Sequence, residues 1–111
     1  MIMKTAELTG DALDWAVVNC IVDVSWKDNE AFIEGHLSRG SPSRDWDEGG
    51  KLIERWGITI IIDHKCGLPV LALTKCGGVG EGPTHLVAAM RSIIDAKEGP
   101  FVEVPEKFTG E

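Results

Sequence analysis

The segment Ile58-Thr-Ile-Ile-Ile62 is the strongest strand signal in this 111-residue chain. It is rich in β-branched residues and apolar on both faces, which predicts a strand near the middle of a sheet. A second apolar run, Leu68 to Thr74, follows the turn-forming residues 63–67. This run predicts an antiparallel partner, with Pro69 at the strand start or at an unpaired N–H. The two runs together predict a β-hairpin.

Two helices are predicted on either side of this hairpin in the sequence. The first runs from about Gly10 to Ile21, with Thr9 placed to cap it and apolar residues at helical spacing. The second runs from about His85 to Lys97, behind the capping residue Thr84. Its apolar stripe predicts a buried face, and Arg91 is predicted to face outward.

A third helix is predicted to start at Asp45-Trp-Asp-Glu48, which has the form of a capping box. Gly49 and Gly50 follow, and each costs about 1 kcal/mol inside a helix relative to alanine. We therefore expect a break after the first turn and a second helical piece from Lys51 to Trp56. Gly57 would provide the left-handed stop.

The remaining segments are less regular. Residues 22–26 and 31–33 surround a polar stretch and predict a hairpin, followed by a surface loop over 35–43. Phe101 to Val104 predicts an edge strand, and residues 106–111 are expected to fray. Together these elements predict an α+β fold: one small domain over residues 1–111, with a mainly antiparallel sheet of three to five strands and two or three helices on one side.

Composition narrows the function classes. The net charge is −7, and the eleven basic residues are scattered singly, so no basic stripe is available for DNA or RNA. The three cysteines include no Cys-x-x-Cys pair, which is typical of free thiols in the cytoplasm. Neither a secretory signal nor a membrane-length apolar run is present. We expect a cytoplasmic protein that binds neither nucleic acid nor membrane; a homo-oligomer stays open.

Two polar segments, Ser41–Gly50 and Gly77–Thr84, each run into a predicted helix and are candidate binding loops. Arg44 suits a carboxylate or phosphate, and Trp46 suits stacking on a ring. The alternative is that the first segment caps its helix and that the second is a flexible connection, since its glycines match no phosphate-binding motif. The candidate ligand-binding residues are Ser41, Ser43, Arg44, Asp45, Trp46, Gly80, Thr84 and His85.

Metal binding and catalysis are weaker interpretations. A metal site drawn from His64, Cys66, Cys76 and His85 lacks the closely paired ligands that are usual for zinc. The same side chains offer the cysteine and histidine of a nucleophilic pair, but no nucleophile elbow or zincin motif accompanies them. We therefore predict no metal, no cofactor and no catalytic residue.

Three blocks of the chain resemble the NinX-like family of small phage and prophage proteins. They are Met3–Val17, Ser41–Glu54 with Gly57-Ile58, and Gly82–Arg91. The resemblance spans nearly the whole chain and is weakest over Asp23–Gly40. It implies a phage or prophage origin, a place in the host cell cytoplasm, and no established biochemical activity. Lys51 and His85 stand where the family often has proline, and both positions suit the first residue of a helix.

Three classes of function remain. The first is non-catalytic binding of a small, nucleotide-like ligand by the two loops, which a phage would use to sequester a host signal and counter host defence. The second is a protein-interaction factor, whose acidic surface and exposed tryptophans engage a host or phage protein. The third is a small hydrolase or transferase. We favour the first, because the loops suit recognition and no catalytic constellation accompanies them.

Overall fold

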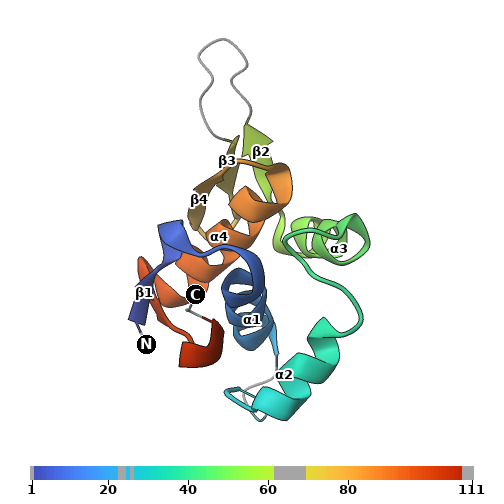
Figure 1. The fold of residues 1–111 in the computed structure, drawn as a ribbon. Coiled ribbons are helices and arrows are strands. Elements are labelled where there is room, and N and C mark those ends of the chain that lie inside the picture. The colour runs from blue at the N-terminus through green and yellow to red at the C-terminus, as the bar shows by residue number, and fades with distance from the viewer. Residues whose placement is uncertain (1, 23–24, 26, 62–69, 109–111) are drawn as a thin grey trace.

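The computed structural model describes residues 2–22, 25, 27–61 and 70–108. They form one small α+β domain, as predicted, but with four helices and two separate antiparallel sheets rather than one (Figure 1). The helices are α1 (Gly10–Ile21), α2 (Glu30–Leu37), α3 (Trp46–Trp56) and α4 (His85–Glu98). The strands are β1 (Ile2–Lys4), β2 (Thr59–Ile61), β3 (Val70–Leu73), β4 (Val79–Gly82) and β5 (Phe101–Glu103).

The core lies where α1 and α4 pack together. α1 is buried from Ala12 to Cys20, so nearly its whole circumference is covered rather than one stripe. α4 also packs against β3 and β4 (Figure 1). Thr9 precedes α1 as predicted, but its side chain makes no capping hydrogen bond.

The predicted β2–β3 hairpin pairing is confirmed, with Thr59 opposite Leu73 and Ile61 opposite Leu71. The central position predicted for the first strand is wrong. The sheet order is β2-β3-β4, so among the described residues β2 lies at an edge, with Thr59 and Ile61 exposed. The reason is that β4 occupies the other side of β3. Pro69 and the connection 62–69 lie outside the described residues.

Strand β4 corrects the prediction of a glycine-rich loop. Residues 79–82 pair antiparallel with β3, and their glycines lie against α4. A methyl group at Gly80 would lie 2.3 Å from the Ala88 carbonyl oxygen, and one at Gly78 would lie 2.1 Å from that of Ser92. The glycines therefore allow a helix and a strand to approach more closely than any side chain permits.

Helix α3 is continuous, so the break predicted at Gly49 and Gly50 is wrong. The Asp45 side chain caps it by accepting from the backbone N–H of Asp47 at 2.9 Å, whereas the capping box predicted a bond to residue 48. Gly57 ends the helix in the left-handed conformation, with φ of 60°, as predicted.

Helix α2 replaces the second strand of the hairpin predicted over 22–33 and the start of the predicted loop over 35–43. Asn29 caps it, accepting from the Phe32 N–H at 3.0 Å. Ile33 is fully buried and attaches the helix to the core. Residues 23, 24 and 26 lie outside the described residues.

The predicted strand β5 is present, but it pairs with β1 rather than with the larger sheet. Residues 106–108, which we expected to fray, form a short 3-10 helix. The ring of Phe108 lies 6.2 Å from that of Trp15, which holds this turn on α1. Residues 109–111 lie outside the described residues.

Candidate functional site

Only the ends of the two predicted binding loops, next to the helices that follow them, meet in space. The residues that precede α3 and those that begin α4 line one cavity of about 310 Å³. Five of the eight candidate residues line it, and they come from two segments about forty positions apart in the chain. The lining residues are Ser43, Arg44, Trp46, Thr84, His85 and Leu86.

A buried carboxylate from α1 holds the first loop in place. Asp14 is 2% exposed and accepts the backbone N–H of Ser43 at 2.8 Å. Its other oxygen accepts from the hydroxyl of Ser41. Arg44 Nη2 lies 3.1 Å from the Asp11 carboxylate and 3.5 Å from that of Asp14. The loop is therefore fixed by charge-assisted hydrogen bonds to one helix.

The sequence pattern does not identify Asp14 as the residue that holds this loop. The available signal was its position between Leu13 and Trp15, inside an apolar helical stretch. A carboxylate that is buried in such a stretch needs donors. The sequence does not say which loop supplies them.

Two helix N-termini open onto the cavity, because α3 begins at Trp46 and α4 begins at His85. The Thr84 hydroxyl caps α4 by accepting from the Val87 N–H at 3.2 Å. The start of each helix carries a partial positive charge from its aligned peptide dipoles. The cavity therefore favours a ligand that carries negative charge.

The cavity also offers an aromatic surface. Trp46 is 58% exposed, and its ring centroid lies 6.0 Å from that of His85, with the planes tilted by 52°. The buried hydroxyl of Ser43 has no hydrogen-bond partner within the described part of the chain. An exposed aromatic ring can stack on a ligand, and a hydroxyl can donate or accept a hydrogen bond.

Three predicted site residues do not line this cavity. Ser41 binds Asp14, and Asp45 caps α3. Gly80 lies in β4 and borders a separate cavity of about 230 Å³ beside Arg91. The glycine segment is therefore not part of the cavity at the helix starts.

Arg91 is buried, which corrects the prediction that it faces outward. Its Nε donates to the Leu8 carbonyl at 2.9 Å, and its Nη1 donates to the Glu81 carbonyl at 2.6 Å. Burial lowers the pKa of this guanidinium from its usual value. Arg91 thus joins α4 to β4 and to the segment before α1.

The hypothetical metal and nucleophile set is only partly described, because His64 and Cys66 lie outside the described residues. Among the described residues, no group of three histidine, cysteine or acidic side chains lies close enough to hold a metal. Cys76 is exposed, whereas Cys20 is buried. Burial, reinforced by the nearby charge of Glu98, raises the pKa of the Cys20 thiol to about 12.

The fold and this cavity define a small, helix-rich α+β domain with a ligand-sized hollow at two helix starts. Residues 4–97 match the family described as Bacteriophage P22, NinX. The chain belongs to this family and is a phage accessory protein. No curated protein sequence matches it. Among the described residues, no helix combines the length and the apolar character needed to cross a membrane.

Proposed function

We propose that this protein acts by binding, without catalysis, a small ligand that combines an anionic group with an aromatic ring, as a nucleotide does. The observation that carries the proposal is that Arg44, Trp46 and His85 line a single cavity at the starts of two helices. Its volume of about 310 Å³ lies at the lower end of the range for ligand pockets.

Each part of such a ligand has a counterpart in the cavity. The Trp46 ring is exposed and offers a face for stacking. The N-terminus of α4 and the guanidinium of Arg44 suit a phosphate or carboxylate. The unused hydroxyl of Ser43 is available for a polar atom of the ligand.

Asp11 and Asp14 oppose the anionic group, since both lie against Arg44. The Arg44 side chain is 63% exposed, so water already weakens its pair with Asp11, which is 75% exposed. An incoming phosphate would compete for the same guanidinium. We therefore expect an affinity that falls as salt concentration rises.

Adenosine monophosphate is the probe that tests this proposal, with adenosine and inorganic phosphate as its separate halves. Binding is measured by calorimetry and by quenching of tryptophan fluorescence. We expect the protein to bind the whole nucleotide. Arg44→Ala should abolish this binding and change the free energy of unfolding by no more than about 0.5 kcal/mol. Arg55→Ala, on the exposed side of α3, is the matched control and should bind normally.

Two results would contradict the proposal. Equal affinities of Arg44→Ala and the parent protein would show that Arg44 does not bind the anionic group. A collapse in the stability of Arg44→Ala would show that this residue is structural. Native mass spectrometry of the protein purified from host cytoplasm then tests the biological role, because a module that sequesters a host signal should retain that molecule.

A further inference from the structure

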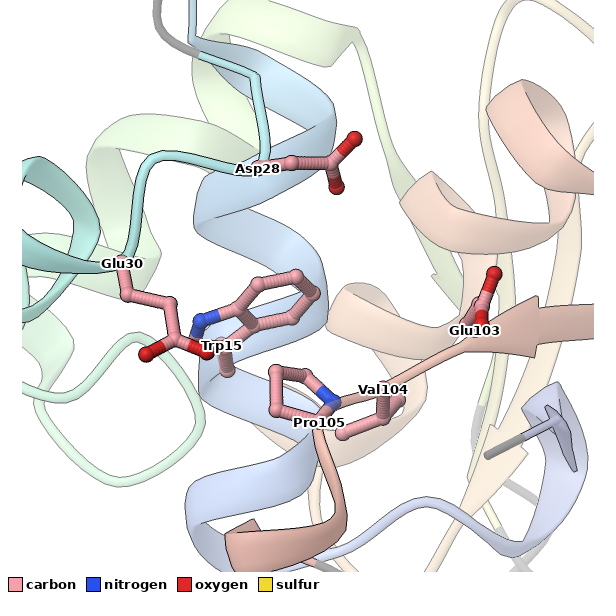
Figure 2. A pocket seen from close by; sticks show the side chains of 6 residues that line it. All are labelled: Trp15, Asp28, Glu30, Glu103, Val104 and Pro105. Atoms are coloured by element: carbon pink, nitrogen blue, oxygen red, sulfur yellow. The ribbon is translucent and has the colours of Figure 1, made fainter.

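A second cavity, of about 340 Å³, lies beside Trp15 and is bordered by carboxylates (Figure 2). Asp28 and Glu30 reach it from the connection before α2 and from the first residue of that helix, and Glu103 reaches it from β5. Val104 and Pro105 form its apolar wall together with the indole. The cavity thus combines acidic groups from two distant parts of the chain with an apolar floor.

No basic side chain lines this cavity among the described residues. Lys27, the basic residue that precedes Asp28 in the sequence, forms an ion pair with Glu98, with its Nζ 3.1 Å from Oε1. That pairing raises the pKa of Lys27, so its charge is retained but engaged elsewhere. Glu103 makes no hydrogen bond or ion pair through its side chain with residues that the structure describes. A cleft lined by one sign of charge concentrates oppositely charged ligands.

Asp28 is held at the cavity by a reciprocal pair of hydrogen bonds. Its backbone N–H donates to Asn19 Oδ1 at 2.7 Å, and Asn19 Nδ2 donates to its carboxylate at 3.1 Å. Its φ of 64° lies in the left-handed region, which costs a non-glycine residue about 1 kcal/mol or more. The acidic side chain is therefore positioned by a buried residue of α1.

The indole of Trp15 is an independent sign of a ligand. It is 3% exposed, and its Nε1 has no hydrogen-bond partner among the described residues. An indole N–H only donates, and a buried donor without an acceptor costs about 1–3 kcal/mol. Figure 2 shows the nitrogen edge turned toward Glu30, at the border of the cavity. An acceptor oxygen of a ligand that enters there would satisfy it.

The carboxylates point to an organic cation rather than to a metal ion. No three acidic, histidine or cysteine side chains in the described ranges are close enough together to hold a metal. A guanidinium has five donors in a planar fork and can serve separated carboxylates at once. The apolar wall of Val104, Pro105 and Trp15 suits the methylene stem that carries such a group.

We propose that this cavity binds an arginine side chain of a basic partner protein. The guanidinium lies between Glu103 and Asp28, and a peptide carbonyl next to the arginine accepts from Trp15 Nε1. This inference rests on different residues from the nucleotide-like site, so each can fail alone.

The test uses the peptide acetyl-Gly-Arg-Gly-amide and the same peptide with neutral citrulline in place of arginine. Binding is followed by the NMR signal of the Trp15 indole N–H, which is assigned by its loss in Trp15→Phe. We expect a saturable shift with the arginine peptide and at least a threefold weaker response to citrulline, about the worth of one exposed ion pair. Glu103→Gln should lower the affinity for the arginine peptide to a similar extent.

Glu54→Gln, which removes one exposed charge from α3, is the matched control and should leave the peptide affinity unchanged. Trp15→Phe serves only to assign the signal, because it removes the observed N–H and also leaves a gap in the core, which should lower the melting temperature. The proposal is overturned by equal responses to arginine and citrulline, or by full affinity in Glu103→Gln. Tighter binding of free spermidine than of the peptide would overturn the assignment to a protein partner.

Discussion

Asp14 is the residue on which the candidate ligand site depends most. It lies in α1, is buried, and accepts hydrogen bonds from Ser41 and Ser43. Because its partners belong to the loop that carries Arg44 and Trp46, its removal would release that loop. The role is structural positioning rather than contact with a ligand.

We predict that Asp14→Ala lowers the free energy of unfolding by about 2–4 kcal/mol, because the buried N–H of Ser43 loses its acceptor. Urea denaturation measures this change. Asp11→Ala is the matched control: its carboxylate also pairs with Arg44, but it is 75% exposed. It should change stability by less than about 1 kcal/mol. Equal losses in the two variants would contradict the positioning role of Asp14.

The cysteines offer a second prediction at this scale. Cys76 is exposed, whereas Cys20 is buried and its pKa is about 12. Because the thiolate is the reactive form, iodoacetamide at pH 8 should modify Cys76 well before Cys20. Peptide mass spectrometry after timed labelling checks the order, and labelling in urea is the control that makes both accessible. Early modification of Cys20 would show that α1 opens readily.

Helix α3 shows how an element can accept two glycines for different reasons. A methyl group at Gly49 would lie 2.4 Å from the Pro42 carbonyl oxygen, so the loop before α3 packs directly on the helix backbone. Gly50 has only Trp46 within 4 Å, at an ordinary contact distance of 3.9 Å. The first glycine is required by packing, and the second is not.

We predict opposite effects for these neighbours. Gly50→Ala should stabilise the protein by about 0.5–1 kcal/mol through helix propensity. Gly49→Ala should destabilise it by about 1–3 kcal/mol, because the loop must move. Thermal unfolding of the two variants provides the comparison, and each is the other's control. A gain in both would mean that Pro42 does not press on the helix.

The elements divide according to whether local chemistry determines them. The ends of α4 and α3 were predictable because Thr84 and Gly57 act within one turn of the helix. β4 was not, since its glycines are explained only by the backbone of α4, about ten residues further along the chain. Helix α2 was missed because a short polar stretch with few apolar residues shows little periodicity of either kind.

The residues of the candidate site differ in the same respect, because only some of them could be predicted from local sequence. Arg44, Trp46 and His85 were identifiable from their places beside helix starts, and the structure brings all three together. Gly80 was predicted to belong to the same site because it shares a glycine-rich segment with Thr84. In the structure it lies in β4 and borders a different cavity. Asp14 was not predicted, and periodicity could not decide whether Trp15 is buried or exposed, because burial depends on tertiary packing.

At the scale of the whole molecule, the pKa of Cys20 links stability to pH. Burial raises the pKa of this thiol from its ordinary value of about 9 to about 12 in the folded protein. Between these values the unfolded chain has lost a proton that the folded protein keeps. Folding is therefore favoured below pH 9, and this contribution is lost as pH rises toward 12. The chain contains no tyrosine, so no phenol titrates in the same range.

We predict that the free energy of unfolding falls between pH 9 and 11 with a slope that approaches about 1.4 kcal/mol per pH unit from this thiol. Urea denaturation at pH 8, 9, 10 and 11 measures the slope. Cys20→Ala should flatten it, although the variant starts from a lower stability at pH 8 because a buried side chain is truncated. Cys76→Ala, which removes an exposed thiol, should keep the parent slope. The same slope in Cys20→Ala and in the parent would place the alkaline transition in other groups and would contradict a tightly closed contact around α1.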